Sequence, residues 1–295
     1  MLKSSSLEPA GVFPANPTKS NYARHYANLV LLYLVMLLGT VVFLGPMIWA
    51  VLSSFKSESQ LYSSFWPAPF TTSAYSSSFS VVSYMGRAFF NSTLDYSIVT
   101  VGAVIFSSMA GYALARLTFV GRNFLFNLIL FTMTIPAMLT LVPLYILIAD
   151  FFNWGDTYQA IIFPAIVSPL GIFLFRQFFS TLPVELFEAA RIDGCTDFGM
   201  LFRIAWPLSK GVVLTVAVLV FMNGWDDFLW PLVVEHNQSY QTASQVVGLF
   251  VQGGQSGGHV PWQLAMACVL AAPVIVIFMF AQKYLVEGIA TTGLK

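Results

Sequence analysis

The sequence predicts an all-α integral membrane protein with six transmembrane helices, from its composition, its apolar segments and the placement of its basic residues. Of 295 residues, 57% are hydrophobic and only 9% are charged, and the mean hydropathy is +0.76. A soluble domain carries roughly 25% charged residues, so this chain cannot cover a water-facing surface. The formal net charge is zero, which argues against nucleic acid as a partner.

Six segments reach the ~20 mostly apolar residues that a spanning helix needs. They cover residues 27–53 and about 93–118, 123–149, 157–179, 211–234 and 261–286. The first is too long for a cleaved signal, and further spans follow it. In domain terms, we expect a polar, mobile N-terminal tail (1–26), a first transmembrane helix (27–53), a core of five helices (90–286) and a C-terminal tail (287–295).

The placement of Lys and Arg predicts the orientation of the spans. Eleven of the 13 basic residues fall near the two tails, in the turn between spans 2 and 3, or in the connection between spans 4 and 5, while the long 1–2 loop holds Lys56 and Arg87. This bias puts both termini and the 4–5 connection in the cytoplasm. Several spans contain proline, which fits either tolerated kinks in a static bundle or broken helices around a pathway.

The 4–5 connection interrupts the apolar sequence with the charged run ELFEAARIDGCTDFGMLFRIAWPLSKG. Pro183 suits a helix start, and Gly194 interrupts the helix that follows. Thr196 can cap a second short helix, which we expect Pro207 to stop. The apolar residues of these two helices need a surface, which could be the underside of the bundle, the headgroup layer or a groove on a partner protein.

This stretch resembles the EAA loop of ABC importer permeases, whose pattern is E-A-A, two residues, D-G, about nine residues, then I-x-L-P. The matching residues are Glu188, Ala189, Ala190, Asp193, Gly194, Ile204 and Pro207. Two positions depart from the pattern, since Cys195 stands where Ala is common and Trp206 where Leu is usual. Segments 91–122, 224–233 and 282–295 extend the resemblance to the carbohydrate branch of the family, and to the shorter permease of maltose-type transporters.

The resemblance implies the type I ABC importer permease fold, with the loop at about 183–207 as a cytoplasmic coupling helix and the seven matching residues as its ATPase-docking site. It implies a bacterial inner-membrane location and three kinds of partner besides lipid: a second permease in a heterodimer, two ATPase subunits and an extracytoplasmic solute-binding protein. ATP and Mg would belong to the ATPase subunits, because this chain has no G-x-x-x-x-G-K-[ST] loop. We therefore predict no cofactor in this chain. The alternative is a loop that packs only on its own bundle.

No pattern of catalytic or metal-binding residues is evident. His25, His236 and His259 are scattered without metal-ligand spacing, and Cys195 and Cys268 form no CxxC pair. We predict a transport subunit without a catalytic or metal site.

Polar and aromatic residues in the fifth predicted span are candidates for the solute path. They are Asn223, Trp225, Asp226, Asp227 and Trp230. Ionisable residues inside spans are costly and usually functional, and carboxylates beside aromatic rings suit a sugar. The alternative is a role in packing or gating near the outer end of the span. The resemblance implies that the sister permease holds most of the sugar, and Asp95 is expected at the outer interface, where it is solvated.

The 5–6 loop, residues 235–263, is long and rich in Gln, Ser and Gly. The resemblance suggests contact with the binding protein, and the alternative is a solvated connector. The sequence thus predicts a permease subunit of an ATP-driven importer for a sugar or sugar-like solute. An importer for an amino acid or peptide is the alternative, and an ion-coupled secondary transporter that uses Asp226 and Asp227 is a more distant one.

Overall fold

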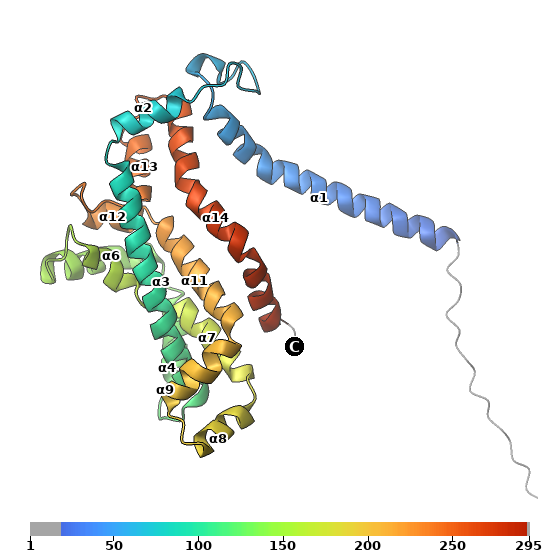
Figure 1. Cartoon of the computed structure of the whole chain (residues 1–295), viewed down its shortest axis with the longest axis vertical. Coiled ribbons are helices and arrows are strands. Elements are labelled where there is room, and N and C mark those ends of the chain that lie inside the picture. Colours follow the sequence, from blue (N-terminus) through green and yellow to red (C-terminus); the bar gives the residue numbers. More distant parts are fainter. Residues whose placement is uncertain (1–18, 294–295) are drawn as a thin grey trace, which may run out of the picture. The chain divides into compact units, whose positions relative to one another are not determined.

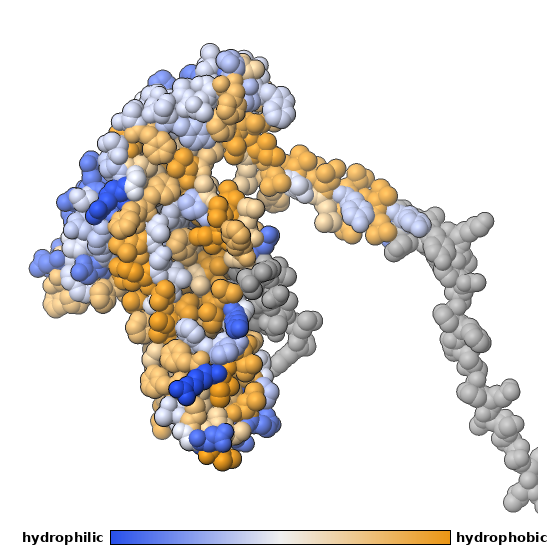
Figure 2. All heavy atoms as spheres, in the orientation of Figure 1, coloured by the Kyte–Doolittle hydropathy of each residue, from blue (hydrophilic) through white to orange (hydrophobic). Residues whose placement is uncertain are grey.

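The computed structural model describes the backbone of residues 19–293 and the side chains of Tyr26 and residues 28–282. The chain divides into two compact units, residues 1–52 and 53–295. The elements within the described range are helices joined by turns and loops (Figure 1). Figure 2 shows apolar side chains over the middle of the second unit, on the face in view, and hydrophilic ones near helix α8.

The first unit consists, in its described part, of most of helix α1 (Lys19–Ser53). Residues 28–53 have the length and hydropathy of a membrane span, so the predicted first helix is confirmed. Pro46 lies inside this helix without ending it. The predicted mobile tail extends too far, since the helix already begins at Lys19, and residues 1–18 lie outside the described residues.

Three helices of the second unit are long and apolar enough to span a membrane. They are α3 (Met85–Arg116), the continuous pair α6 (Tyr158–Ala165) and α7 (Pro169–Thr181), and α14 (Val260–Gly293) up to residue 282. With α1 they make four candidate spans, or up to six if each of two bent pairs counts as one span. Helix α14 continues to Gly293, so most of the predicted C-terminal tail is helical.

The helices predicted at 123–149 and 211–234 are both broken. The first break makes one of the two bent pairs, whereas the other bent pair joins Asp197–Leu208 to Lys210–Trp225 at 87°, ahead of the break in the second predicted helix. Helix α4 (Arg122–Thr132) meets α5 (Ala137–Tyr145), which continues as a π turn (Ile146–Phe151), at an angle of 96°. Pro136 stands at that break, where proline disfavours a helical residue before it. Helix α11 (Lys210–Trp225) ends early, and α12 (Leu229–Val234) restarts after three residues.

The 5–6 loop folds against the bundle, which corrects the alternative that it is a solvated connector. This loop contains α13 (Ala243–Gln252), capped by the Thr242 hydroxyl, which accepts from the Gln245 backbone N–H. Ala243, Val246 and Phe250 are fully buried. They pack in one cluster with residues of α3, α14 and the segment after α2 (Ser73–Val81).

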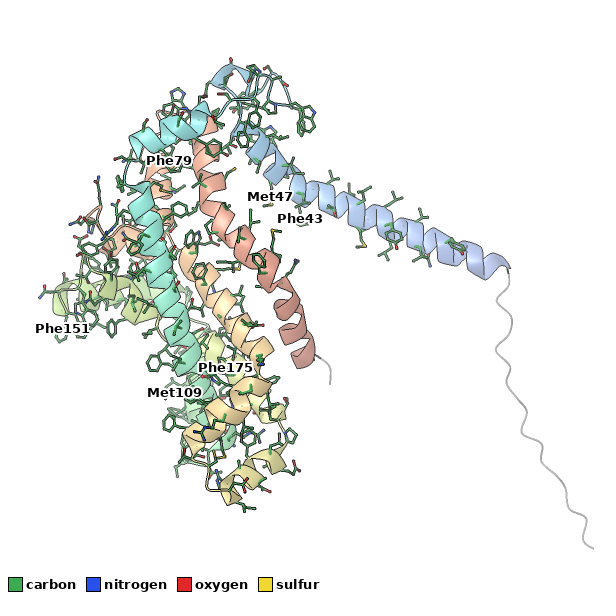
Figure 3. The ribbon with its side chains drawn as sticks, viewed as in Figure 1. Phe43, Met47, Phe79, Met109, Phe151 and Phe175 are labelled. Carbon is green, nitrogen blue, oxygen red and sulfur yellow. The ribbon has the colours of Figure 1, made fainter. Side chains whose placement is uncertain are left out.

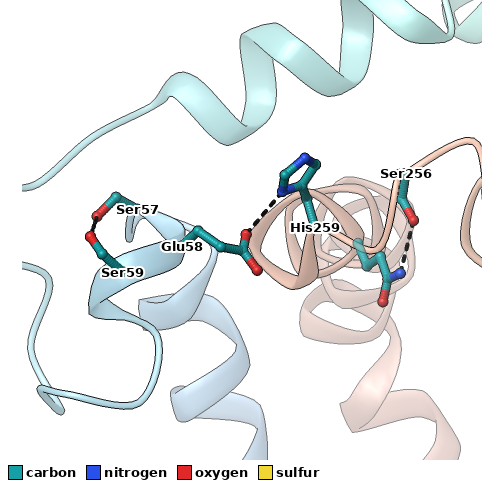
Figure 4. Close-up of polar contacts among 6 residues, drawn as sticks. Ser57, Glu58, Ser59, Ser256 and His259 are labelled. Atoms are coloured by element: carbon teal, nitrogen blue, oxygen red, sulfur yellow. Dashed lines mark hydrogen bonds and ion pairs between the residues drawn. The ribbon is translucent and has the colours of Figure 1, made fainter.

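Two polar contacts link the start of α14 to neighbouring loops (Figure 4). His259 Nδ1 lies 3.3 Å from Glu58 Oε2, next to a short 3₁₀ turn (Glu58–Gln60), and Gln263 Nε2 donates to Ser256 Oγ at 2.8 Å. Asn91 of α3 donates from Nδ2 to the carbonyls of Ser239 and Gln241, both at 3.0 Å. The N-terminal ends of α3 and α14 are therefore tied to loops that are distant in sequence.

Helix α3 is the centre of the second unit and packs along α7, α11 and α13. Glycines allow the closest approaches, as is common between helices in membranes. A Cβ at Gly111 would lie 2.6 Å from Phe175 Cβ of α7 (Figure 3), and one at Gly224 of α11 would lie 2.3 Å from Tyr96 Cδ1. Asp95 also lies on α3 and is fully buried, so the prediction of a solvated position at the outer interface is wrong.

The close packing of α3 on α7 predicts opposite effects of two alanine substitutions on one helix. Gly111→Ala forces Phe175 and the Arg176 backbone to move, and overpacking of this kind costs about 1–3 kcal/mol. Gly86→Ala is the control, because a Cβ there meets no described atom within 4 Å and alanine favours a helix. Thermal unfolding in detergent should show a lower midpoint for Gly111→Ala only. Equal midpoints for the two variants would contradict the packing described.

The burial of Glu235 predicts a pH dependence of stability. Burial, and secondarily the charges of Asp156 and Asp95, raise the pKa of Glu235 from 4.5 to about 9. The folded chain therefore binds a proton that the unfolded chain releases, so its stability falls as the pH rises from about 4.5 to about 9.

Glu235→Gln should remove this slope and raise the unfolding midpoint at pH 8, whereas Glu185→Gln, at an exposed site, should leave the slope unchanged. Thermal unfolding of both variants from pH 5 to pH 9 checks this. A wild-type slope in Glu235→Gln would show that another group causes it.

Candidate functional site

The charged connection folds into two helical arms that meet at Gly194, as predicted. The first arm is α8 (Val184–Ile192), with Pro183 before it, Glu185 in its first turn and Arg191 in its last. This placement of charge suits the helix dipole. Gly194 has φ +79°, a conformation that glycine adopts without strain.

The second arm is longer than predicted. Thr196 caps α9 (Asp197–Met200) by accepting from the Gly199 backbone N–H at 3.2 Å, as expected. The helix then passes through a π turn (Leu201–Ala205) into α10 (Trp206–Leu208), so Pro207 does not stop it. The break comes at Ser209, where the arm meets α11 at 87°.

The residues of the E-A-A and D-G pattern lie together on this connection. Glu188, Ala189, Asp193 and Gly194 are exposed, and Ala190 is half-buried. A Cβ on Gly194 would meet no described atom within 4 Å. Ile204 and Pro207 lie apart from this group on the second arm, half-buried and exposed respectively.

Helix α8 is amphipathic in a way that separates its two surfaces. Phe187 is 6% exposed and packs against the bundle, whereas Ile192 is 87% exposed. Packing on the bundle therefore covers the side of α8 that carries Phe187 and leaves Glu188, Ala189 and Ile192 exposed. Across the bend, Arg191 pairs with Asp197 at 3.3 Å, an exposed contact worth under about 1 kcal/mol.

The sequence did not predict that Arg116 holds the connection against the bundle. Arg116, at the end of α3, donates to the carbonyls of Phe179 and Leu182, and its guanidinium carbon lies 4.5 Å from the ring centroid of Phe187. The available sequence signal is the A-R pair near the end of the predicted second span, which by itself indicates orientation and family resemblance but no contact with the connection.

The five solute-path candidates occupy different environments. Trp225 is 1% exposed, stacks on Phe221 at 5.6 Å between ring centroids, and donates from Nε1 to the Leu270 carbonyl at 3.0 Å. These contacts favour its alternative role in packing. Asn223 and Asp226 are exposed.

Asp227 and Trp230 share one cavity of about 300 Å³, whose other walls come from α5 and α6. Asp227 Oδ1 accepts from the backbone N–H groups of Leu229 and Trp230, at 3.2 and 3.3 Å, and so caps α12 at the break. Trp230 Nε1 donates to the Ala160 carbonyl at 2.9 Å. The helix break thus brings a carboxylate and an indole ring to the same hollow.

Among the described residues, no group of three or more His, Cys, Asp or Glu side chains is placed to hold a metal ion. Cys195 and Cys268 are free thiols. Helix α8 thus lies at one end of the second unit (Figure 1) with an exposed surface. A mainly apolar cavity with Asp227 in its wall lies beside the broken helix.

Comparison with known proteins identifies the family. Residues 103–291 match the model of the binding-protein-dependent transport system inner membrane component. The chain is 35% identical over 255 residues to the arabinooligosaccharides transport system permease protein AraQ of Halalkalibacterium halodurans, covering 85% of this chain and 90% of that one. It is 34% identical over 208 residues to the sn-glycerol-3-phosphate transport system permease protein UgpE of Brucella abortus, covering 70% and 73% of the two chains.

A solved structure supports the same fold. The solved structure is the crystal structure of a bacterial ABC transporter involved in the import of the acidic polysaccharide alginate. One of its chains superposes on this chain with a TM-score of 0.75 and 22% sequence identity. The match covers 91% of this chain and 99% of that one. The predicted all-α permease fold is confirmed, and this chain belongs to the binding-protein-dependent transport system inner membrane components, the permease subunits of ABC importers.

Proposed function

We propose that this permease imports an oligosaccharide or another sugar-like solute. The relatives that it resembles include a permease named for arabinooligosaccharides and one named for sn-glycerol-3-phosphate, both hydroxyl-rich solutes. A carboxylate beside an indole ring in one hollow suits such a solute, because it combines hydrogen bonding to hydroxyls with stacking on a sugar ring.

The exposed surface of α8 is the observation that carries the proposed mechanism. It presents an apolar side chain, Ile192, next to a small one, Ala189, and a carboxylate, Glu188. A short helix with such a surface fits a groove on a partner protein. That partner is an ATPase subunit, which binds the ATP and Mg that this chain does not, and residues 183–207 are the coupling segment.

The orientation follows from the basic residues at the same end of the second unit. We call residues 183–209, which carry α8 and the second arm, the docking connection. Five basic residues lie on it or at the ends of the neighbouring helices: Arg116, Arg122, Arg191, Arg203 and Lys210. Basic residues concentrate on the cytoplasmic side, so this end and both termini face the cytoplasm. The outer loops that include α13 then face the solute-binding protein.

The full importer consists of this chain, a second and different permease subunit, two ATPase subunits and the binding protein. In that assembly, residues 1–26 and 287–295 are cytoplasmic, and residues 90–286 form the transmembrane core. The cavity at Asp227 opens toward the interface of the two permeases. Solute passes there as the assembly alternates between inward- and outward-facing states.

The docking surface predicts that Glu188→Lys and Gly194→Val reduce recovery of the ATPase with the purified permease by about tenfold or more. Valine at Gly194 is strained because φ is +79° there. Glu185→Lys is the matched control, since it makes the same charge change three residues before Glu188. Pull-down of the ATPase from detergent-solubilised membranes measures this, and undiminished recovery in both test variants would contradict it.

The solute assignment is tested through the binding protein. We expect the ATPase activity of the reconstituted complex to rise when the binding protein is added with an oligosaccharide from a panel that also contains glycerol phosphate, amino acids and peptides. Stimulation by an amino acid or peptide alone would support the alternative importer class. Solute uptake driven by an ion gradient without ATP would support the secondary transporter.

The cavity predicts that Asp227→Asn lowers solute uptake at a fixed solute concentration by about tenfold while ATPase recovery stays unchanged. Asparagine keeps an oxygen that can cap α12, so the helix break is preserved. Asp226→Asn is the control, because Asp226 is exposed and lies outside the cavity. Equal uptake by the two variants would remove Asp227 from the solute path.

A further inference from the structure

One stripe of α3 contacts both arms of the docking connection. Ser108, Tyr112 and Arg116 are spaced by four residues, so they lie on one side of the helix. Each of them contacts the connection or the end of α7 that leads into it.

Arg116 fixes the first arm. Its Nη2 donates to the carbonyl of Phe179 at 2.5 Å and to that of Leu182, just before α8 begins. Its guanidinium lies over the ring of Phe187, the buried residue of α8. Moving α8 away from α3 would therefore break the ring contact, and moving the end of α7 away would break the carbonyl contacts.

Tyr112 fills the space between the arms. It is 4% exposed, and its ring centroid lies 6.0 Å from that of Phe179 and 6.1 Å from that of Phe187. The cluster also contains Met200 and Leu201 of the second arm. Both arms therefore pack in the cluster that contains Tyr112.

Ser108 fixes the second arm. Its hydroxyl accepts from the indole Nε1 of Trp206 at 2.9 Å, while it donates to the Ile105 carbonyl of its own helix. Trp206 is one of the two positions where the chain departs from the family pattern. A leucine there could not make this hydrogen bond.

The other half of α3 reaches the broken fifth helix. Tyr96 packs against Gly224, two residues before the break at which Asp227 caps α12. Helix α3 has 32 residues without an internal proline, so it is about 48 Å long and continuous. Figure 1 shows it running from the end that holds α8 and α9 to the end that holds α2 and α13.

We propose that Ser108, Tyr112 and Arg116 form the mechanical link through which a displacement of the docking connection moves α3, with Arg116 as the main positioning residue. The displaced α3 then shifts Tyr96 against Gly224 and changes the hollow at the helix break. This inference rests on the proposed function of α8 as the ATPase-docking helix. It adds the route by which movement at that surface reaches the solute path.

The test uses the complete importer and a reporter on α11. Asn223→Cys, in a chain with Cys195 and Cys268 replaced by alanine, is labelled with a membrane-impermeant maleimide before and after trapping with ATP and vanadate. Arg116→Gln should retain the ATPase at the wild-type level but reduce the nucleotide-driven change in labelling rate at least about fivefold. Arg116→Lys, which can donate to the carbonyls but lacks the planar group for stacking, should restore part of it.

Arg176→Gln is the matched control. Arg176 lies at the same end of the second unit, but its guanidinium stacks on Phe126 of α4, 3.7 Å from the ring centroid. It should keep the full labelling response. A wild-type change in labelling rate in Arg116→Gln, with the ATPase still bound, would overturn the proposed link. If the Asn223→Cys chain with an intact Arg116 fails to retain the ATPase, that result would instead contradict the proposed function.

A second measurement covers the case in which Arg116→Gln does not insert. Ser108→Ala and Trp206→Phe each remove one side of a single hydrogen bond and keep the packing of the ring or helix. If that bond transmits movement, each variant should lower the labelling response, and the double variant should lower it no further than either one. Full responses in both single variants would overturn the link at the second arm.

Discussion

The fold of this permease depends on satisfying backbone hydrogen-bonding groups wherever a helix breaks. In a membrane no water is available for this, so each break needs a partner from within the protein. Asp227 provides one by accepting two backbone N–H groups at the start of α12. Ser168 provides another, accepting the Gly171 N–H at the start of α7. The helix breaks, which allow a hollow in the second unit, exist because these side chains stand beside them.

The sequence predicted the apolar segments and the docking connection well because both depend on local patterns. A run of apolar residues identifies a span. Gly194 indicates a helix end because glycine adopts positive φ, and Thr196 indicates a helix start because its hydroxyl can cap one. The place where the second arm ends was harder. Pro207 normally ends a helix, but here the preceding π turn changes the hydrogen-bond pattern and the helix continues to Leu208.

Features that depend on distant contacts escaped the sequence analysis. Phe250 belongs to a Gln- and Gly-rich loop, and only its contacts with α3 and α14 show that α13 is part of the core. Asp95 was expected in water at the end of a span, yet it is fully buried. For the solute path, composition selected five residues, but the cavity contains two of them, Asp227 and Trp230.

The pairing of Ser107 with Ser168 has a consequence for how the bundle can deform. Ser107 Oγ donates to the Ser168 carbonyl at 3.1 Å and accepts from its backbone N–H at 3.2 Å, so α3 supplies both partners at the junction of α6 and α7. Sliding α7 along α3 by one helical turn would leave this junction unsatisfied inside the membrane. These two hydrogen bonds therefore oppose sliding of α7 along α3. We expect the two helices to tilt together, with the α6–α7 junction as their fixed point of contact.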